Sequence, residues 1–373
     1  MKKWVLALVL VGIGVGLVWV FVINKQQIFF LSPIGLGEVE DKRAEMRVVG
    51  FLPPWNINKA KIEAKTLDEL IFLGIESDEK GQLIWDLQSR KINNEVYLDM
   101  KQEMKSKGKK NVVGIKLFED NKIDILLNDS VSVDNLVREI EGVVLAGGFD
   151  GVNIDFEYQG DPVAILSDEF FAFLEKLRET DLGEIGVDVF CNTVNKGSVE
   201  DLAKLWGLTD YVLIMAYDFT RPGVDYTGPV APIKALPGKR SIWETFSRVV
   251  DLGLDTKKLV AAYPLYGYEW KTETSEFGSK IIRGWYQTAS LRRIRELLKE
   301  NKEIVRNWDE LSMTPWLAWE EDGVWRQIYY DDEVSLKEKF KLAVDMNVGG
   351  IGFWALGYEG DSKVWETVEN TVK

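Results

Sequence analysis

Short apolar runs alternate with stretches of helical periodicity along most of the chain after residue 46. Eight runs have strand character: RVVGFL from Arg47, ELIFLGI from Glu69, NVVGIKLF from Asn111, GVNIDFE from Gly151, GVDVFCN from Gly186, YVLIMAY from Tyr211, LVAAYPL from Leu259 and GGIGFWAL from Gly349. Between them apolar residues recur at helical spacing, as Leu136, Ile140 and Val143 do. This alternation is typical of a parallel sheet covered by helices. Eight such units predict a (β/α)8 barrel, with a doubly wound open sheet as the alternative.

The interval between the last two runs, from Tyr263 to Gly349, is far longer than a single crossover needs. It contains strand-like KIIRGWY, helical SLRRIRELLKEN, and strand-like TPWLAW and VWRQIYY. We therefore expect a small α+β insertion at about residues 268–335, walling one side of the barrel mouth, within a catalytic domain spanning residues 46–373. Asp361 is expected to cap the last helix, in SKVWETVENTV.

The chain begins with an uncharged apolar run from Trp4 to Ile23, preceded by Lys2 and Lys3. A helix that crosses a bilayer needs about 20 residues, whereas the core of a cleavable signal peptide has about 7–15. No Ala-x-Ala-like cleavage site follows. Residues 1–25 are therefore expected to be a cytoplasmic stub and a transmembrane anchor that crosses the lipid bilayer with residues 4–23, and residues 26–45 a linker. The rest would lie outside the membrane, or be secreted if the segment is cleaved.

The amino-acid composition excludes several kinds of catalytic and metal site. The chain has no histidine and a single cysteine, Cys191, so His-based triads, His-ligated zinc and internal disulfides are excluded. The 60 acidic against 46 basic residues argue against a nucleic-acid partner. Acid–base catalysis must then use Asp, Glu, Tyr or Lys. We expect no metal and no cofactor, and a monomer.

The segment GFDGVNIDFEY carries acids inside an apolar strand. Side chains alternate along a strand, so apolar Val152, Ile154 and Phe156 share one face. Asn153, Asp155 and Glu157 share the other face. In a barrel this polar face points inward and rises to the carboxyl-end rim, where barrel enzymes do chemistry. The alternative is that this polar face is the solvent-exposed face of an antiparallel sheet. The surrounding pattern of a parallel sheet disfavours this, because parallel strands are normally covered on both faces.

Asp155 and Glu157 are two positions apart, which separates their Cα atoms by roughly 6.6 Å on a strand. At this distance each carboxylate makes ionisation of the other less favourable. One of the two should keep its proton nearer to neutral pH, which is what a general acid requires.

At these residues the sequence resembles glycoside hydrolase family 18, the chitinases and their relatives. The family signature D-x-x-D-x-D-x-E is matched by Asp150, Asn153, Asp155 and Glu157, with Asn at the second acidic place. Three further segments match in order: MAYD from Met215, AYPLYGYEW from Ala262 and GGIGFWALG from Gly349. The likeness spans roughly residues 46–370. DGVNIDFE, with GPVAP and GIGFWALGYEGD, looks most like the bacterial spore-germination and cell-wall N-acetylglucosaminidases, which act on peptidoglycan.

The resemblance implies a role for each matching residue. Glu157 would protonate the glycosidic oxygen, while the N-acetyl carbonyl of the substrate attacks the anomeric carbon. Asp155 would orient the acetamido N–H, and the Tyr217 hydroxyl would donate to the acetamido oxygen. Asp218 would hold a sugar hydroxyl, and Trp354 would form the floor under the sugar.

Other residues are expected to contact the substrate around this centre: Asp150, Asn153, Met215, Tyr266 and Trp55. Five tryptophans are candidates for stacking on further sugars, of which about one in three is expected in the groove: Trp55, Trp270, Trp285, Trp316 and Trp319. Asn153 departs from the family pattern because an amide cannot take up a charge or exchange a proton, so an altered pH dependence is expected. The usual S-x-G-G of strand three is replaced by VVGIKLF, which leaves the chemistry near Lys116 open.

The sequence therefore predicts a membrane-anchored glycosidase that cleaves β-1,4 bonds next to N-acetylglucosamine in peptidoglycan or chitin-like glycans. A non-catalytic, lectin-like barrel of the same fold is the alternative. The presence of Glu157, Asp155 and Tyr217 favours the enzyme. A polysaccharide deacetylase-like activity is disfavoured, because that chemistry generally uses histidine metal ligands.

Overall fold

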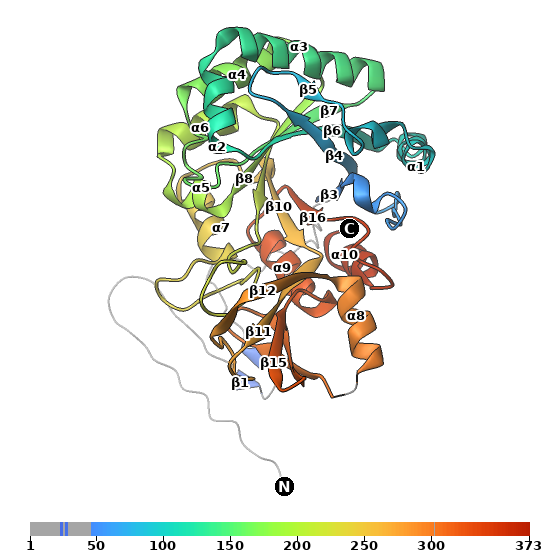
Figure 1. Cartoon of the computed structure of the whole chain (residues 1–373). Helices are drawn as coiled ribbons and strands as arrows, with labels where there is room; N and C mark the ends of the chain where they lie inside the picture. Colours follow the sequence, from blue (N-terminus) through green and yellow to red (C-terminus); the bar gives the residue numbers. More distant parts are fainter. Residues whose placement is uncertain (1–22, 25–26, 29–45, 302) are drawn as a thin grey trace, which may run out of the picture. The chain divides into compact units, whose positions relative to one another are not determined.

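The computed structural model describes residues 23–24, 27–28, 46–301 and 303–373 (Figure 1). Residues 1–43 and 44–373 form two separate units. In the first, Ile23–Asn24 (β1) pairs antiparallel with Gln27–Ile28 (β2). Apart from these four positions, the expected anchor at residues 4–23 and linker at residues 26–45 lie outside the described residues. Within the described part of the chain, no helix has the length and apolarity to cross a membrane.

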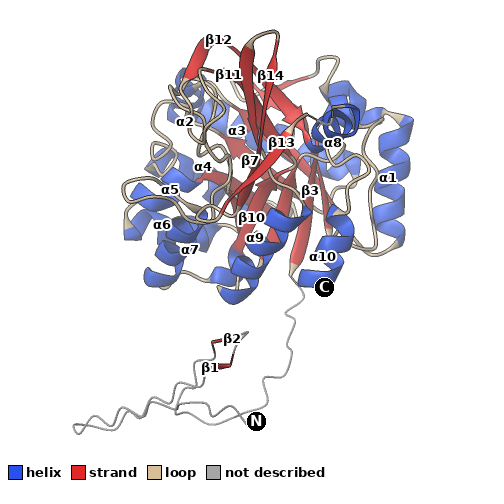
Figure 2. Cartoon of the chain, turned by 90° about the horizontal axis from the view of Figure 1, so that it is seen from below, coloured by secondary structure: helices blue, strands red, loops and turns tan. Residues whose placement is uncertain are grey.

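The second unit is a closed barrel of eight parallel strands. They are β3 (Arg47–Leu52), β4 (Glu69–Ser77), β6 (Lys110–Leu117), β7 (Gly151–Phe156), β8 (Glu184–Phe190), β9 (Tyr211–Met215), β10 (Leu259–Pro264) and β16 (Gly350–Trp354). Their order is β3-β16-β10-β9-β8-β7-β6-β4, and the parallel pairing of β3 with β4 closes the ring. Figure 2 shows the strands inside and the helices around them. The eight predicted strands are confirmed, and the open-sheet alternative is wrong. A short strand β5 (Leu83–Ile84) pairs antiparallel with the end of β4.

The helices that cover the barrel are α1 (Glu95–Ser106), α2 (Asp120–Asn128), α3 (Ser130–Gly147), α4 (Asp168–Arg178), α5 (Cys191–Lys196), α6 (Val199–Leu208), α7 (Ile242–Asp251), α9 (Glu333–Asp345) and α10 (Val364–Val372). Short 3-10 turns occupy Pro54–Asn56, Ser89–Asn93 and Thr256–Lys258. Polar side chains mark several helix starts: Asn94 accepts from the first turn of α1, and Asp332 forms a capping box on α9. The expected cap of α10 by Asp361 is wrong. That carboxylate instead accepts hydrogen bonds from Arg295 and Lys299.

Two apolar layers hold the barrel together. Outside it, strand residues pack on the helices, as Phe156 of β7 does by stacking on Phe173 of α4 with ring centroids 5.8 Å apart. Inside it, residues of five strands form a smaller core, including Val49, Ile71 and Leu213. The inward positions of β7 and β8 are where polar side chains replace this core.

A charged and hydrogen-bonded layer lies at the amino-terminal ends of the strands. Tyr211 reaches across to Glu69, to whose carboxylate it donates a hydrogen bond of 2.6 Å. Gly186 leaves room for this ring, since a Cβ there would lie 2.2 Å from the Tyr211 Cζ atom. Arg47 donates to Glu184 at 2.8 Å and lies 3.6 Å from Glu69. The carboxylates of this layer therefore have cationic or phenolic partners.

The insertion between β10 and β16 is a five-stranded antiparallel sheet with one helix. Its elements are β11 (Tyr266–Thr272), β12 (Ile281–Ser290), α8 (Leu291–Glu300), β13 (Val305–Asp309), β14 (Thr314–Glu321) and β15 (Val324–Tyr329), with the sheet in the order β12-β11-β15-β14-β13. KIIRGWY, TPWLAW and VWRQIYY correspond to β12, β14 and β15. The sequence did not separate β11 from β10, because only Leu265 lies between them, and it missed the largely exposed β13.

Candidate active site

A cavity of about 320 Å³ opens at the carboxyl ends of the barrel strands. The barrel contributes Phe51, Trp55, Leu73, Lys116, Phe118, Asp155, Glu157, Gln159, Asp188, Phe190, Met215, Tyr217, Asp218, Arg221, Trp354 and Tyr358. The insertion contributes Tyr266, Tyr268 and Thr288. The insertion therefore forms part of the cavity wall, as the sequence predicts.

Strand β7 brings its polar face into the barrel. Asn153 and Asp155 are buried there, and Glu157 follows directly after the strand, at the cavity. Val152, Ile154 and Phe156 belong to the outer apolar layer between strands and helices. The alternation expected from the sequence is confirmed, and the alternative of a solvated antiparallel face is wrong.

The Glu157 carboxyl group is poised to exchange a proton near neutral pH. Burial is the largest cause, and it raises the pKa of Glu157 to about 7. A hydrogen bond of 2.7 Å from Gln159 Nε2 to Oε2 and the charge of Arg221 oppose this rise. Glu157 can therefore hold a proton at neutral pH and release it during a reaction.

Asp155 lies one inward position below Glu157. Burial raises the pKa of its carboxyl group above the ordinary range, and the charges of Glu157 and Asp188 raise it further. Lys116, which faces Asp155 across the β6–β7 pairing, acts in the opposite direction. The Asp155 Oδ1 atom is buried and accepts no hydrogen bond from any described residue. A buried acceptor without a donor is rare in native proteins, so this atom is available to an N–H group of a ligand.

Asn153 contacts a carboxyl group that the sequence did not single out. Its Nδ2 atom donates a hydrogen bond of 2.7 Å to Oδ1 of Asp188 on β8, and both side chains are buried. Burial raises the pKa of Asp188, and the charges of Glu157 and Glu69 add to the rise. The available signal was a single carboxylate at an inward position of the apolar strand GVDVF. Asn153 is buried and does not line the cavity, and its contact with the substrate stays a prediction.

Asp150 lies at the opposite end of β7 from Glu157. Its carboxylate accepts a hydrogen bond of 2.8 Å from the backbone N–H of Asn111, at the start of β6. It is exposed and does not line the cavity. The expectation that Asp150 binds substrate is therefore wrong, because the strand carries it to the amino-terminal end of the barrel. Its role is to join two strand starts.

Residues after β9 meet the insertion at the cavity wall. Tyr217 packs edge-on against Tyr266 with centroids 6.1 Å apart, and burial raises its pKa. Asp218 accepts hydrogen bonds from the hydroxyls of Tyr266 at 2.5 Å and Tyr268 at 3.0 Å. Its backbone has φ = 58°, the left-handed region that Asp tolerates better than most residues. Met215 also lines the cavity. The structure thus brings all four residues predicted from these two segments together.

Further aromatic rings line the cavity around the end of β16. Trp354, at the end of β16, packs edge-on against Phe51 and Trp55, with centroids 6.1 and 6.4 Å away. Trp55 is 47% exposed, so its ring is accessible from solvent. Of the five tryptophans considered for stacking, only Trp55 lines this cavity, and Trp270, Trp316 and Trp319 are buried within the insertion.

A family model, that of the glycosyl hydrolases family 18, matches residues 47–359. The chain belongs to this family. The match covers the barrel and the insertion, and the family expected from the sequence is confirmed.

Curated relatives include a putative sporulation-specific glycosylase, a cortical fragment-lytic enzyme and a chitinase. The putative sporulation-specific glycosylase YdhD of Bacillus subtilis (strain 168) is 27% identical over 242 residues, which cover 62% of this chain and 52% of the relative. The cortical fragment-lytic enzyme of the same organism is 22% identical over 250 residues, covering 64% and 54%. Chitinase B of Serratia marcescens is 25% identical over 284 residues, covering 57% and 55%. The chain spans about half the length of these relatives.

Solved structures share the fold. The spore cortex-lytic enzyme SleL of Bacillus cereus matches with a TM-score of 0.70 and 16% identity, covering 88% of this chain and 75% of the other. The Group IV chitinase of Ostrinia furnacalis matches with a TM-score of 0.75 and 17% identity, covering 88% and 99%. At these identities the likeness concerns the fold alone.

Glu157→Gln should stabilise the folded chain at alkaline pH. The native pKa of Glu157, about 7, exceeds the usual value of about 4.3, so the native state binds more protons between these pH values. The wild type should therefore lose stability as the pH rises through this window. At pH 8 the variant should gain at most about 4 kcal/mol in unfolding free energy, and near pH 4 almost nothing.

Urea unfolding of the full-length chain at both pH values measures this difference. Glu103→Gln on α1 removes an exposed carboxylate and serves as the matched control. A Glu157→Gln effect that is the same at pH 4 and pH 8 would contradict the assignment of the buried, proton-holding group.

Proposed function

We propose that the chain is a glycosidase that hydrolyses β-1,4 bonds next to N-acetylglucosamine in peptidoglycan or chitin-like glycans. The observation that carries the proposal is Glu157, whose pKa is about 7, positioned at the cavity above the buried Asp155. Membership of family 18 supports it. Relatives named as glycosylase, cortical fragment-lytic enzyme and chitinase support the choice of glycan.

In the first step, protonated Glu157 gives its proton to the glycosidic oxygen. The acetamido carbonyl oxygen of the substrate attacks the anomeric carbon as the bond to the leaving sugar breaks, which forms an oxazolinium ion. Glu157, now a carboxylate, then takes a proton from water as that water attacks the same carbon. Two displacements at one carbon retain its configuration, and no protein nucleophile is required.

The neighbours of Glu157 supply the remaining interactions. Asp155 Oδ1, which lacks a donor, would accept the acetamido N–H and stabilise the positive charge of the oxazolinium ion. The Tyr217 hydroxyl would donate to the acetamido oxygen, and Asp218 would bind a sugar hydroxyl. Trp354 would present its ring to the apolar face of the sugar.

Asp188 would supply the carboxyl group that the second acidic residue of the family signature provides, at the place where this chain has Asn153. Asn153 cannot carry a charge, but it donates its amide hydrogen to a buried carboxyl group on the adjacent strand. The second buried carboxyl group beside Asp155 therefore comes from β8 in place of β7. We assign Asp188 as a positioning residue that sets the protonation of Asp155 and Glu157.

A lectin-like barrel remains the second candidate function. It would use the aromatic wall formed by Trp55 and Trp354 to hold a glycan without cleaving it. The joint presence of Glu157, Asp155 and Tyr217 in one cavity favours hydrolysis, because binding alone does not require a buried acid with a pKa of about 7.

We also propose that residues 4–23 anchor the protein in a membrane, with the amino terminus cytoplasmic and the barrel outside. This proposal rests on the uncharged apolar run and the two lysines before it. Cleavage of the segment would instead release the protein by secretion.

Glu157→Gln should lower glycan hydrolysis by about 10²–10⁴-fold, the usual contribution of a general acid. Release of reducing ends from peptidoglycan and from chitin oligomers measures it, with Glu103→Gln as the control. Wild-type protein that binds both glycans but releases no reducing ends would establish the lectin-like function.

Asp188→Asn should move the alkaline limb of the pH–activity profile to lower pH. The substitution removes a buried negative charge that interacts with Asp155 and Glu157, so these groups would lose their protons more easily. The measurement is kcat/KM against pH beside the wild type. A profile that falls in amplitude at every pH, with unchanged limbs, would show that Asp188 only maintains the structure.

Full-length protein should stay with cell membranes after an alkaline carbonate wash. A Leu10→Asp variant places a charge within the apolar run, at a cost of about 3 kcal/mol at the centre of a membrane helix, and should reduce this retention. Intact mass identifies the amino terminus. A soluble product that begins after residue 23 would establish secretion in place of anchoring.

A further inference from the structure

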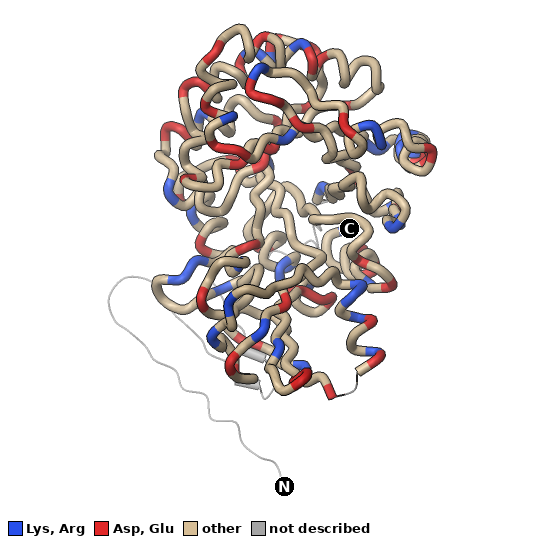
Figure 3. Tube along the Cα trace, in the orientation of Figure 1, with Lys and Arg blue, Asp and Glu red and all other residues tan. Residues whose placement is uncertain are grey.

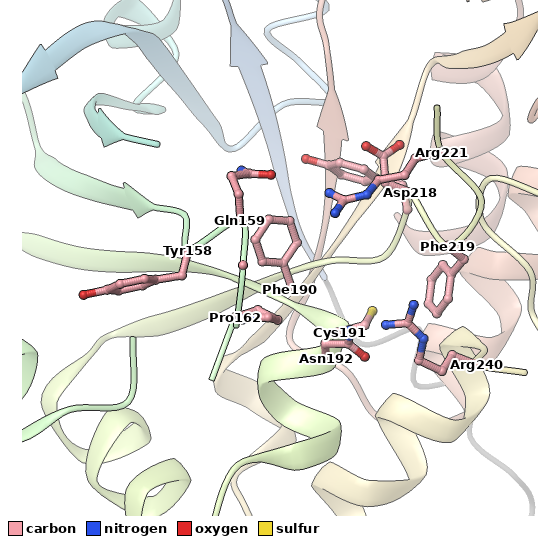
Figure 4. A pocket seen from close by; sticks show the side chains of 12 residues that line it. Tyr158, Gln159, Pro162, Phe190, Cys191, Asn192, Asp218, Phe219, Arg221 and Arg240 are labelled. Atoms are coloured by element: carbon pink, nitrogen blue, oxygen red, sulfur yellow. The ribbon is translucent and has the colours of Figure 1, made fainter. Parts of the chain in front are cut away.

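A second pocket, of about 130 Å³, adjoins the catalytic cavity (Figure 4). The two share Gln159, Phe190, Tyr217, Asp218 and Arg221 as lining residues. A substituent of a sugar bound above Glu157 can therefore extend into this second pocket. The mechanism derived above makes no use of it.

Two arginines reach into this pocket from the two ends of the loop between β9 and α7. Arg221 lies in the loop after β9, Arg240 lies just before α7, and both side chains extend into the pocket in Figure 4. We name it the arginine pocket after these two residues. Several arginines elsewhere are ion-paired, as Arg178 is with Asp210 at 2.7 Å, whereas others, such as Arg248, donate to backbone carbonyls. Neither Arg221 nor Arg240 has a carboxylate partner among residues 46–301 and 303–373, so each remains available to an anion.

An uncompensated acceptor lies in the same pocket. The Oδ1 atom of Asn192 is buried and receives no hydrogen bond from the described residues. Buried oxygens of this kind normally have a donor. A ligand that carries an N–H or O–H group beside its negative charge would satisfy Asn192 and the two guanidinium groups together.

The local charge contrasts with that of the whole chain. The chain has a net charge of −14, and acidic and basic residues are interspersed over the fold in Figure 3. Long-range attraction of an anionic polymer is thus not expected, because the overall field repels it. Recognition of an anion must come from short-range contacts, and guanidinium–carboxylate hydrogen bonds are among the strongest of these.

We propose that the arginine pocket binds the carboxylate-bearing substituent of an N-acetylmuramic acid residue. This inference rests on the proposed function and narrows its substrate to peptidoglycan strands. Chitin is uncharged and offers no group to Arg221 and Arg240. Muramic acid carries a lactyl ether that ends in a carboxylate, or in an amide-linked peptide with its own N–H groups and carboxylates.

Arg240 is the residue that tests the proposal. Arg221 also lines the catalytic cavity and lowers the pKa of Glu157, so its replacement would alter catalysis directly. Arg240 lines the arginine pocket but not the catalytic cavity. Lys239, the preceding residue, is exposed and lines neither, so Lys239→Gln removes the same charge from the same loop.

Binding is measured with full-length Glu157→Gln protein, in which hydrolysis is suppressed. The ligands are a tetrasaccharide of alternating N-acetylglucosamine and N-acetylmuramic acid, its carboxyl methyl ester, and the N-acetylglucosamine tetramer. The free acid should bind about ten- to hundredfold more tightly than the ester, as expected for hydrogen bonds to a charged group. Adding Arg240→Gln should remove this preference, Arg240→Lys should restore part of it, and Lys239→Gln should leave it intact.

Equal affinities for acid and ester would overturn the proposal. An equal loss of the preference for the acid in Lys239→Gln would also overturn the proposal. The preference would then depend on the overall charge of the loop and not on a contact with Arg240. Hydrolysis by the wild type tests the proposed function separately. If Glu157→Gln protein prefers the acid but wild type cleaves neither glycan, the proposed anion site is supported and the proposed glycosidase activity is refuted. If wild type cleaves both glycans and Glu157→Gln protein binds acid and ester equally, the glycosidase activity is supported and the proposed anion site is refuted.

Discussion

Removal of carboxyl groups from water, inside a closed parallel barrel, is the constraint on which the rest of the site depends. The pairing of β3 with both β16 and β4 leaves no sheet edge through which water could enter between strands. Asp155 and Asp188 therefore lie in an interior where ionisation is costly, and burial is the largest cause of their raised pKa values. Glu157, at the mouth, feels the same effect and holds its proton near neutral pH.

Acidic side chains have different partners at the two ends of the barrel. At the amino-terminal end, Glu184 and Glu69 have Arg47 beside them, and Glu69 also accepts a hydrogen bond from Tyr211. At the carboxyl end, one oxygen of Asp155 has no donor among the described residues. Glu69 Oε2 also lacks a hydrogen bond among the described residues but lies 3.6 Å from Arg47, whereas Asp155 lines the cavity and its unpaired oxygen is available to a ligand. Carboxyl groups therefore stabilise the fold at the amino-terminal end of the barrel and form the candidate active site at the carboxyl end.

The site depends on segments from outside the strand that carries its acids. The insertion orients Asp218 through two tyrosine hydroxyls, so the wall of the cavity and this carboxylate are one hydrogen-bonded unit. Strand β8 supplies Asp188, the partner of Asn153. The single loop between β9 and α7 supplies both arginines of the second pocket. A substitution of the family aspartate at position 153 is tolerable in such a site, because a neighbouring strand provides a carboxyl group.

The sequence by itself determined the eight strands, the inward direction of Asn153 and Asp155 and the position of Glu157 above them. It could do so because alternation along a strand is a property of the local backbone. Only the tertiary structure decided which groups meet. Asn153 and Asp188 are 35 positions apart, Asp150 lies at the far end of its strand, and Arg221 and Arg240 come together from distant points of the one long loop between β9 and α7. Such pairings follow from strand register and from the paths of loops, and no periodicity in the chain encodes either.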